Sequence, residues 1–232
     1  MEIYIIRHGQ SVNNSTEHLA QRVCDPPLTA VGRQQAQCLA RRLENLDWAR
    51  LSPNDCEQGL HLTRLYTSPM LRAIQTAEAI RQTTGLLPHV RDDIHEHGGI
   101  WLDHDDGRGP IGLPGLGRSQ IQQQFPHAVV PESIRDDGWW NRPFEPDQSA
   151  YARAQRVGKE LKALADMPER IGFVSHGGYA DNLISTLLDM PFVGYVRFGH
   201  NNTAVTRLDL GSERVALQFL NRVDHLPQEL VT

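Results

Sequence analysis

The strongest constraint on the fold is a short apolar run at the start of the chain, Glu2–Ile6, which ends at Arg7-His8-Gly9. An apolar run of so few residues, without alternating polar positions, is typical of a strand that is buried on both faces, as in a parallel sheet. The run therefore favours a covered parallel sheet, and it places two basic side chains directly after the first strand.

Strand-like and helix-like segments alternate along most of the chain. Helical spacing and end signals predict four helices: from Thr29 as the N-cap to about Leu46, from Ser68-Pro69 to about Thr84 with Gly85 closing it, over about 148–165, and from Gly178 to about Leu188. Further strands are expected at Thr63–Thr67, Pro88–Ile94, Arg170–Ser175, Ala204–Leu210 and Arg214–Asn221, with a loop over 50–62. This alternation predicts an α/β fold with a mostly parallel central sheet and helices on both faces.

The segment from about residue 96 to residue 147 breaks the pattern. It is rich in glycine and proline and carries Trp101, Trp139 and Trp140. Such a density of turn-forming residues argues against long regular elements. We interpret the segment as a loop-rich cap inserted into a single domain that spans residues 1–232, and we expect Trp139 and Trp140 to pack the cap onto the core.

The charge of the chain excludes some classes of partner. A formal net charge of −5 argues against nucleic acid or an anionic membrane as the main partner, so an anion site must be built locally from a few arginines and backbone amides. Cys24, Cys38 and Cys56 form no CxxC pair, and no apolar run is long enough to span a membrane. With a strand-like run at the N-terminus in place of a signal peptide, we expect a cytoplasmic protein. The sequence indicates no oligomeric state.

Four polar motifs follow predicted strands. They are Arg7-His8-Gly9, the segment from Ser68 to Arg72, Glu96, and His176-Gly177-Gly178. In open α/β sheets, ligands bind outside the carboxyl ends of the strands. We therefore expect all four motifs to lie on the same edge of the sheet.

Each motif alone is weak, because short runs of common residues recur by chance. Together they occur in a fixed order: RHGQSxxN at 7–14, LTxxGxxQA at 28–36, SPxxRAxQTA at 68–77 and VSHGG at 174–178. With an acidic residue at Glu96, this set resembles the histidine phosphatase superfamily, the phosphoglycerate-mutase-like proteins. The resemblance extends from Met1 to the last strand, and the cap is the part that matches least.

The resemblance implies that His8 attacks phosphorus, that Arg7 and Arg72 hold the phosphoryl oxygens, and that His176 is the second histidine of the pocket. The chemistry suits these residue types. A neutral imidazole offers a lone pair, and nearby guanidinium groups disfavour its protonation. Phosphoryl transfer spreads negative charge over three oxygens, which guanidinium forks bind well.

Two further positions, Asn14 and Glu96, are assigned by resemblance. Asn14 matches an asparagine that completes the phosphate contacts, although it could instead cap a turn. On chemical grounds, the amide of Gly9 or Gly177 could add another donor to the phosphate. Glu96 is the best match for the acid that protonates the leaving oxygen, with Asp92 and Asp93 as alternatives.

Residue types that bind metals also occur around the start of the cap: His95, His97, His104, Asp103, Asp105 and Asp106. They lack the helical HExxH spacing, and a glycine-rich loop is a poor scaffold for a metal site. We expect a solvated polar loop, and the resemblance implies neither a metal ion nor an organic cofactor.

The superfamily includes phosphatases and mutases. The pattern typical of the mutases has Glu after RHG and Trp before the Asn. This chain has Gln10 and Asn13 at those positions. The sequence therefore favours a phosphomonoester hydrolase that acts on a small phosphorylated substrate. A phosphoglycerate mutase-type phosphotransferase is the alternative, and an inactive relative that binds phosphorylated ligands is a third hypothesis. The sequence does not identify the substrate.

Overall fold

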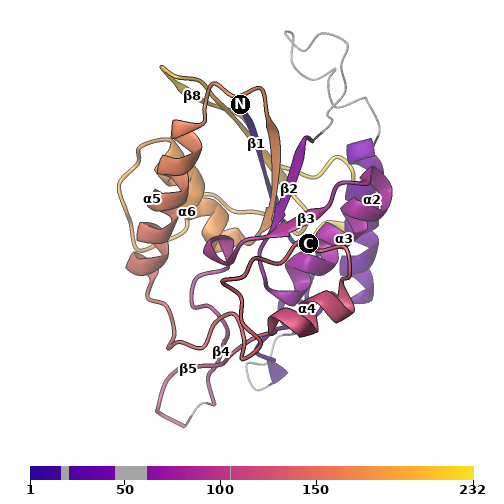
Figure 1. Ribbon diagram of the computed structural model, residues 1–232, viewed down its shortest axis with the longest axis vertical. Coiled ribbons are helices and arrows are strands. Elements are labelled where there is room, and N and C mark those ends of the chain that lie inside the picture. The colour runs from indigo at the N-terminus through magenta and orange to yellow at the C-terminus, as the bar shows by residue number, and fades with distance from the viewer. Residues whose placement is uncertain (17–20, 45–61, 105) are drawn as a thin grey trace.

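The computed structural model describes residues 1–16, 21–44, 62–104 and 106–232, and its centre is a six-stranded sheet (Figure 1). The strands are β1 (Glu2–Arg7), β2 (Arg64–Thr67), β3 (Pro88–Val90), β6 (Arg170–Ser175), β7 (Val205–Leu210) and β8 (Val215–Arg222), in the spatial order β3-β2-β6-β1-β7-β8. The first four of these strands run parallel, whereas β7 and β8 pair antiparallel at one edge. This arrangement confirms the predicted mostly parallel sheet.

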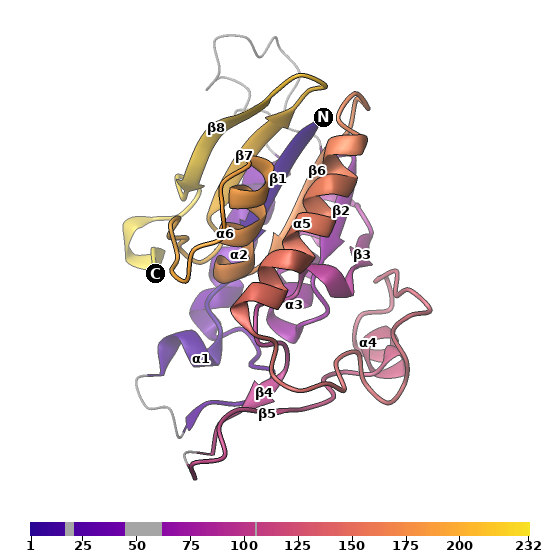
Figure 2. The same ribbon diagram turned by 90° about the vertical axis from the view of Figure 1, so that its left-hand side faces the viewer.

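Helices cover both faces of the sheet, as Figure 2 shows. The helices α2 (Ala30–Glu44) and α3 (Leu71–Thr84) pack on one face, and α5 (Asp147–Ala163) and α6 (Gly177–Leu187) pack on the other. The first strand shows why: Ile3 and Ile5 belong to the core under α5 and α6, whereas Tyr4 and Ile6 belong to the core under α2 and α3. A strand buried on both faces needs apolar residues at every position.

Element ends follow the predicted signals at some places and depart from them at others. The amide of Gly32 donates to the Thr29 hydroxyl at 3.0 Å, so Thr29 caps α2 as expected. The helix α3 ends at Gly85, whose φ of 77° is the left-handed conformation that glycine favours. The predicted helix end near Leu46 and the predicted loop lie at or beyond the boundary of the described residues, apart from residue 62, which is described.

Two predicted boundaries were wrong. The helix α3 begins at Leu71 rather than at Ser68-Pro69, because the amide of Ser68 still bonds to Val174 of β6. The strand β3 stops at Val90, and a 3₁₀ turn, η3 (Asp92–Ile94), follows where the strand was expected to continue.

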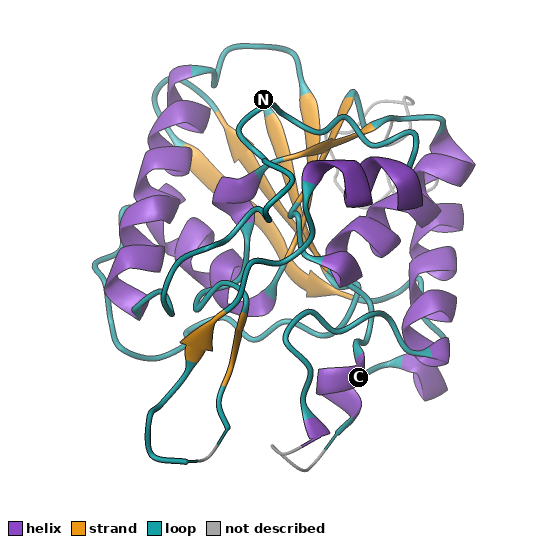
Figure 3. Cartoon of the chain, turned by 60° about the horizontal axis from the view of Figure 1, so that its bottom comes forward, coloured by secondary structure: helices purple, strands orange, loops and turns teal. Residues whose placement is uncertain are grey.

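The cap contains more regular structure than its composition suggests. It holds a two-stranded ribbon of β4 (Trp101–Leu102) and β5 (Ile111–Gly112), which stands away from the central sheet in Figure 3, and a helix, α4 (Arg118–Gln124). A third apolar cluster joins cap residues such as Ile100 and Ile121 to Met70 and Ile74 of the core. Trp139 and Trp140 are buried in this cluster, so they pack the cap onto the core as predicted.

The described residues also include the short helices α1 (Val12–Ser15) and η4 (Gln228–Leu230). Of the helices that the structure describes, none combines the length and the apolar character needed to cross a bilayer.

Candidate active site

The carboxyl ends of the parallel strands bring the predicted motifs together. Arg7 at the end of β1 pairs with Ser175 at the end of β6. The amide of His8 donates to the Ser175 carbonyl at 2.9 Å. The residues that directly follow these two strands, His8 and His176, therefore lie side by side, with ring centroids 5.1 Å apart.

The His8 imidazole is buried and its two nitrogens have different partners. Nδ1 lies 2.6 Å from the carbonyl oxygen of Gly9, so Nδ1 carries the proton and donates it to that oxygen. Nε2 then has the lone pair, and it accepts a hydrogen bond from Nε of Arg72 at 3.0 Å. Burial lowers the pKa of His8 well below its ordinary value, and the charges of Arg72 and Arg7 lower it further. The geometry presents a neutral imidazole with an aimed lone pair.

The two arginines approach this lone pair from different elements. Arg7 extends from β1 and donates one N–H to the carbonyl oxygen of His200, while its buried Nε has no hydrogen-bond partner among the described residues. Arg72 lies in the first turn of α3, with its nearest carboxylate oxygen, on Asp25, 3.9 Å away. Guanidinium N–H groups that lack a close anion can bind phosphoryl oxygens.

Asp25 lies beside the candidate site and was not singled out from the sequence. Its carboxylate accepts the amide of Leu71 at 3.0 Å, at the start of α3, and faces Arg72. Burial raises its pKa to about 6, against the lowering effect of Arg72. The only sequence signal for Asp25 is its place three residues before the LTxxGxxQA motif.

His176 is completely buried and is held by Ser68, a second residue whose role was missed. Nε2 of His176 lies 2.8 Å from the Ser68 hydroxyl, which also accepts the amide of Met70 at 3.3 Å. The Ser68 hydroxyl has one O–H to donate, and when it donates to Nε2 the proton of His176 lies on Nδ1. Nδ1 has no partner among the described residues and is available to a ligand oxygen. Burial lowers the pKa of His176 well below its ordinary value.

Glu96 lies at the N-terminus of α6. Its carboxylate accepts the amides of Gly178 at 3.1 Å and Tyr179 at 2.9 Å, an arrangement that the helix dipole favours. Burial raises the pKa of Glu96, but the hydrogen bond and charge of His97, followed by the charge of Arg72, outweigh it and hold the pKa at about 2. Before substrate binds, Glu96 is a carboxylate.

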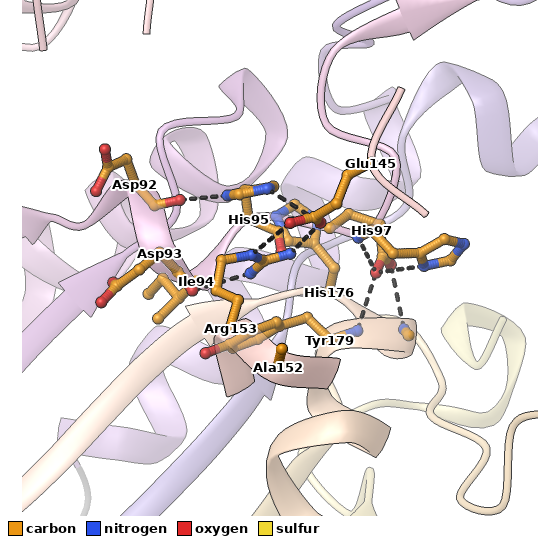
Figure 4. A network of polar contacts seen from close by, with 12 residues as sticks. Asp92, Asp93, Ile94, His95, His97, Glu145, Ala152, Arg153, His176 and Tyr179 are labelled. Atoms are coloured by element: carbon orange, nitrogen blue, oxygen red, sulfur yellow. Dashed lines mark hydrogen bonds and ion pairs between the residues drawn. The ribbon is translucent and has the colours of Figure 1, made fainter. Parts of the chain in front are cut away.

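The alternative acids lie elsewhere. Asp93 forms hydrogen bonds of 2.9 and 2.7 Å with Arg91, and the carbonyl oxygen of Asp92 bonds to His95. Figure 4 shows both carboxylates turned away from His97 and His176. Of the three candidates, Glu96 is the one placed beside the arginines.

Asn14 and Gly177 make contacts that the motif did not reveal. Asn14 Oδ1 accepts the amide of Ser11 at 3.0 Å and so caps α1, which is the structural alternative that the sequence left open. Among the described residues the amide nitrogen of Asn14 has no hydrogen-bond partner, so it can serve a ligand. The same oxygen lies 3.3 Å from Asn202 Nδ2, which also donates to the carbonyl oxygen of His8. Gly177 lies against Arg7, since a Cβ there would be 3.6 Å from Nε.

The metal-binding residue types do not converge. In residues 1–16, 21–44, 62–104 and 106–232, no group of three or more His, Cys, Asp or Glu is placed to hold a metal ion. His95 packs against Trp139 and Trp140, whereas His97 faces Glu96. Asp105, which the sequence analysis included in this cluster, lies outside the described residues.

Residues 3–223 match the family model of the histidine phosphatase superfamily, branch 1. The chain belongs to this superfamily. Curated relatives named probable phosphoglycerate mutase GpmB include those from Cronobacter sakazakii, 26% identical over 220 residues, and Escherichia coli K12, 26% identical over 213 residues. Each alignment covers 90% of this chain and 85% of the relative.

Solved histidine phosphatase folds agree with this assignment. The structure of mycobacterial hydrolase 1 is 25% identical, with a TM-score of 0.60 and coverage of 95% of this chain and 98% of that one. Phosphoserine phosphatase from Entamoeba histolytica, solved with 3-phosphoglyceric acid, is 22% identical with a TM-score of 0.63, and the match covers 97% and 99% of the two chains. At that identity the second match shows the shared fold. The protein is thus an enzyme of the histidine phosphatase superfamily, as the motifs had indicated.

Proposed function

We propose that this enzyme hydrolyses phosphomonoesters through a phosphohistidine on Nε2 of His8, without a metal ion. The observation that carries the proposal is the buried imidazole whose Nδ1–H is bound to the Gly9 carbonyl and whose Nε2 lone pair faces Arg72. A nucleophilic nitrogen needs that lone pair, and its protonation is disfavoured here by burial and by two arginines.

The surrounding donors suit a phosphoryl group. Arg7, Arg72 and the Nδ1–H of His176 would bind its oxygens, with the amides of Asn14 and Gly177 as further donors. In the free enzyme the Arg72 Nε–H donates a hydrogen bond to His8. On substrate binding, this N–H donates to a phosphoryl oxygen instead, which frees the His8 lone pair for attack. Charge developing on the equatorial oxygens is then met by preorganised donors, which is the main source of catalysis in phosphoryl transfer.

Glu96 is the proposed proton donor to the leaving oxygen. The dianionic phosphoryl group raises the pKa of a neighbouring carboxylate, so the ionised Glu96 of the free enzyme can take up a proton as substrate binds. In the second half of the reaction, the carboxylate accepts a proton from the water that attacks the phosphohistidine.

A phosphoglycerate mutase activity is the second candidate, because curated relatives carry that name. Two positions favour hydrolysis. Gln10 bonds to the Thr29 hydroxyl at 2.7 Å, and Asn13 exchanges two hydrogen bonds with the backbone of Val23. Gln10 and Asn13, which are bonded to neighbouring residues in this way, occupy the positions of the Glu and Trp in the mutase pattern. The name mycobacterial hydrolase 1, given to a structure 25% identical, is consistent with hydrolysis.

The test is to trap the intermediate. After brief reaction with a ³²P-labelled phosphomonoester and quenching without acid, label should be found on His8 as an acid-labile, base-stable phosphoramidate. The His8→Ala variant should carry none. Label on a serine, or no label on the wild-type protein during turnover, would refute the mechanism.

The same preparation distinguishes hydrolase activity from mutase activity. With p-nitrophenyl phosphate the enzyme should release inorganic phosphate in the presence of EDTA. With 3-phosphoglycerate and its bisphosphate it should form little 2-phosphoglycerate. Efficient interconversion without phosphate release would establish the mutase instead.

A further inference from the structure

Glu96 is ionised in the free enzyme, so the proton that it gives to the leaving oxygen must come from another group. Four N–H groups converge on its two oxygens: the amides of His97, Gly178 and Tyr179, and Nδ1 of His97. All four stabilise the ionised form. A group that must give a proton to the leaving oxygen is therefore kept without one until the reaction begins.

His97 is the one donor of this set whose proton can move. Its Nδ1 lies 3.1 Å from Oε1 of Glu96, and its own amide donates to the same oxygen at 3.0 Å. The other donors are peptide amides, which do not titrate. The side chain of His97 is 43% exposed, so the ring can exchange protons with water while it contacts a carboxylate that is itself only 21% exposed.

The charges around the pair favour a proton on the imidazole. Glu96 is the largest influence, and Asp147 at the start of α5 and Glu145 just before that helix add to it, so the pKa of His97 is raised above its ordinary value. Arg7 and Arg72 face Glu96 from the phosphate side, and the N-terminus of α6 opposes the imidazolium. In the free enzyme, therefore, the proton between Glu96 and His97 lies on Nδ1 of His97.

We propose that His97 stores the proton that Glu96 delivers to the leaving group, and that the two residues form a relay between solvent and the scissile oxygen. This proposal rests on the proposed hydrolase function. His97 acts through Glu96, and it need not touch the substrate.

The proton balance is simple. Nδ1 of His97 passes its proton to the Glu96 carboxylate, and His97 becomes a neutral imidazole protonated on Nε2. As His8 Nε2 bonds to phosphorus and the P–O bond breaks, Glu96 gives this proton to the leaving oxygen and is a carboxylate again. When water attacks the phosphohistidine, its proton passes to Glu96 and back to Nδ1 of His97. One ester and one water become one alcohol and one phosphate, and both residues return to their initial state.

The second glycine of the SHGG motif makes room for this pair. A Cβ on Gly178 would lie 2.6 Å from His97 Nδ1 and 2.8 Å from Glu96 Oε1, closer than a carbon atom can approach either. Only glycine lets the helix N-terminus contact the carboxylate while the imidazole lies over it.

The experiment compares two substitutions. In His97→Asn the side-chain amide replaces Nδ1–H as a donor to Glu96 but holds no transferable proton, whereas His97→Ala removes both. The exposed His127 provides the matched control, His127→Asn. For each variant, kcat/KM is measured from pH 4 to 9 with an alkyl phosphate and with p-nitrophenyl phosphate, whose leaving group needs little protonation.

A relay predicts that His97→Asn and His97→Ala behave alike. Alkyl phosphate hydrolysis at neutral pH should fall by about 10-fold or more, as expected for part of a general-acid contribution, and p-nitrophenyl phosphate hydrolysis by less than about 3-fold. In the wild type, the decline at high pH should lie above pH 6.5, since the pKa of His97 is raised. In both variants this decline should move toward acid, where Glu96 itself takes a proton.

Two results would overturn the relay. If His97→Asn keeps the wild-type pH profile and rate, His97 only positions Glu96. If both substrates lose activity equally, His97 serves folding or phosphate binding. A wild-type protein that releases no phosphate from either ester would instead refute the proposed function, and the relay with it.

Discussion

Arg153 joins the cap to the core, and its substitution should lower the free energy of unfolding by a measurable amount. It projects from α5, is 4% exposed, and forms hydrogen bonds of 3.0 and 2.6 Å with the two carboxylate oxygens of Glu145 in the cap. Its third nitrogen donates to the carbonyl oxygens of Asp93 at 2.9 Å and His95 at 3.0 Å. Figure 4 shows the guanidinium between Glu145 and His95, and His95 directly precedes Glu96 in the sequence.

In Arg153→Met the apolar stem is retained and the charge is lost. Breaking a buried ion pair by removing one partner typically costs about 3–5 kcal/mol. A second estimate comes from Glu145. Burial raises its pKa, but the interactions with His95 and Arg153 outweigh this and hold it at about 2, below its usual 4.5. That difference corresponds to about 3 kcal/mol, which solvent screening of a partly accessible carboxylate reduces to about 2 kcal/mol. We expect a loss of about 2–4 kcal/mol at pH 7.

The pH dependence provides a specific check of this reasoning. The wild-type carboxylate stabilises the fold above its unfolded-state pKa of about 4.5, and this contribution is lost as pH falls toward 2. In Arg153→Met the buried Glu145 has lost its main partner, so its pKa rises toward or above 4.5 and the variant has little such contribution to lose. The difference in unfolding free energy should therefore shrink by about 1–2 kcal/mol between pH 7 and pH 3.

Urea unfolding followed by tryptophan fluorescence measures the effect, since Trp139 and Trp140 are buried against His95. The control is Arg156→Met, an exposed arginine on the same helix, which should change the stability by less than about 0.5 kcal/mol. A loss below about 1 kcal/mol at pH 7, or a difference that does not shrink at pH 3, would refute the assigned role of the pair.

Two further substitutions test the acid and its support. Glu96→Gln should reduce alkyl phosphate turnover by about 10²–10⁴-fold and p-nitrophenyl phosphate turnover much less, and intact alkyl phosphate turnover would direct the search to Asp92 or Asp93. Gly178→Ala should displace Glu96 and His97, destabilise the protein by about 1–3 kcal/mol and lower alkyl phosphate turnover. Gly194→Ala, where a Cβ would meet no atom within 4 Å, is its control, and equal effects of the two substitutions would contradict the close packing described for Gly178.

The fold was largely predictable because its determinants are local. The both-face burial of Glu2–Ile6 and the cap at Thr29 follow from residues close together in sequence. The start of α3 was not predictable in this way. Ser68 resembles a helix N-cap, yet its amide pairs with β6, a strand more than a hundred residues later. The helix of the cap and the segment before its ribbon were missed because their apolar residues Ile121 and Ile100 join a cluster with Met70 and Ile74, which are distant in the sequence.

The candidate site was predictable to the extent that motifs mark strand ends. His8 and His176 were expected on one edge of the sheet, and the structure places their rings 5.1 Å apart. The residues that orient them were missed. Ser68 contacts His176 across 108 positions, and Asn202 contacts His8 across 194. No local pattern can reveal a hydrogen bond whose partners meet only when the sheet has formed.

The segment 95–97 lies where the cap and the core meet, and this position has a consequence for specificity. The carbonyl of His95 is held by the Arg153–Glu145 pair, which belongs partly to the cap, while Glu96 is held by the N-terminus of α6 in the core. The groups proposed to surround phosphorus come from the ends of the core strands and from α3. Changes in the cap that leave Arg153–Glu145 intact should therefore alter which alcohol binds, and so KM, while the chemistry at phosphorus is kept. Changes that disturb the pair should move the acid and lower kcat, most strongly for esters whose leaving groups need a proton.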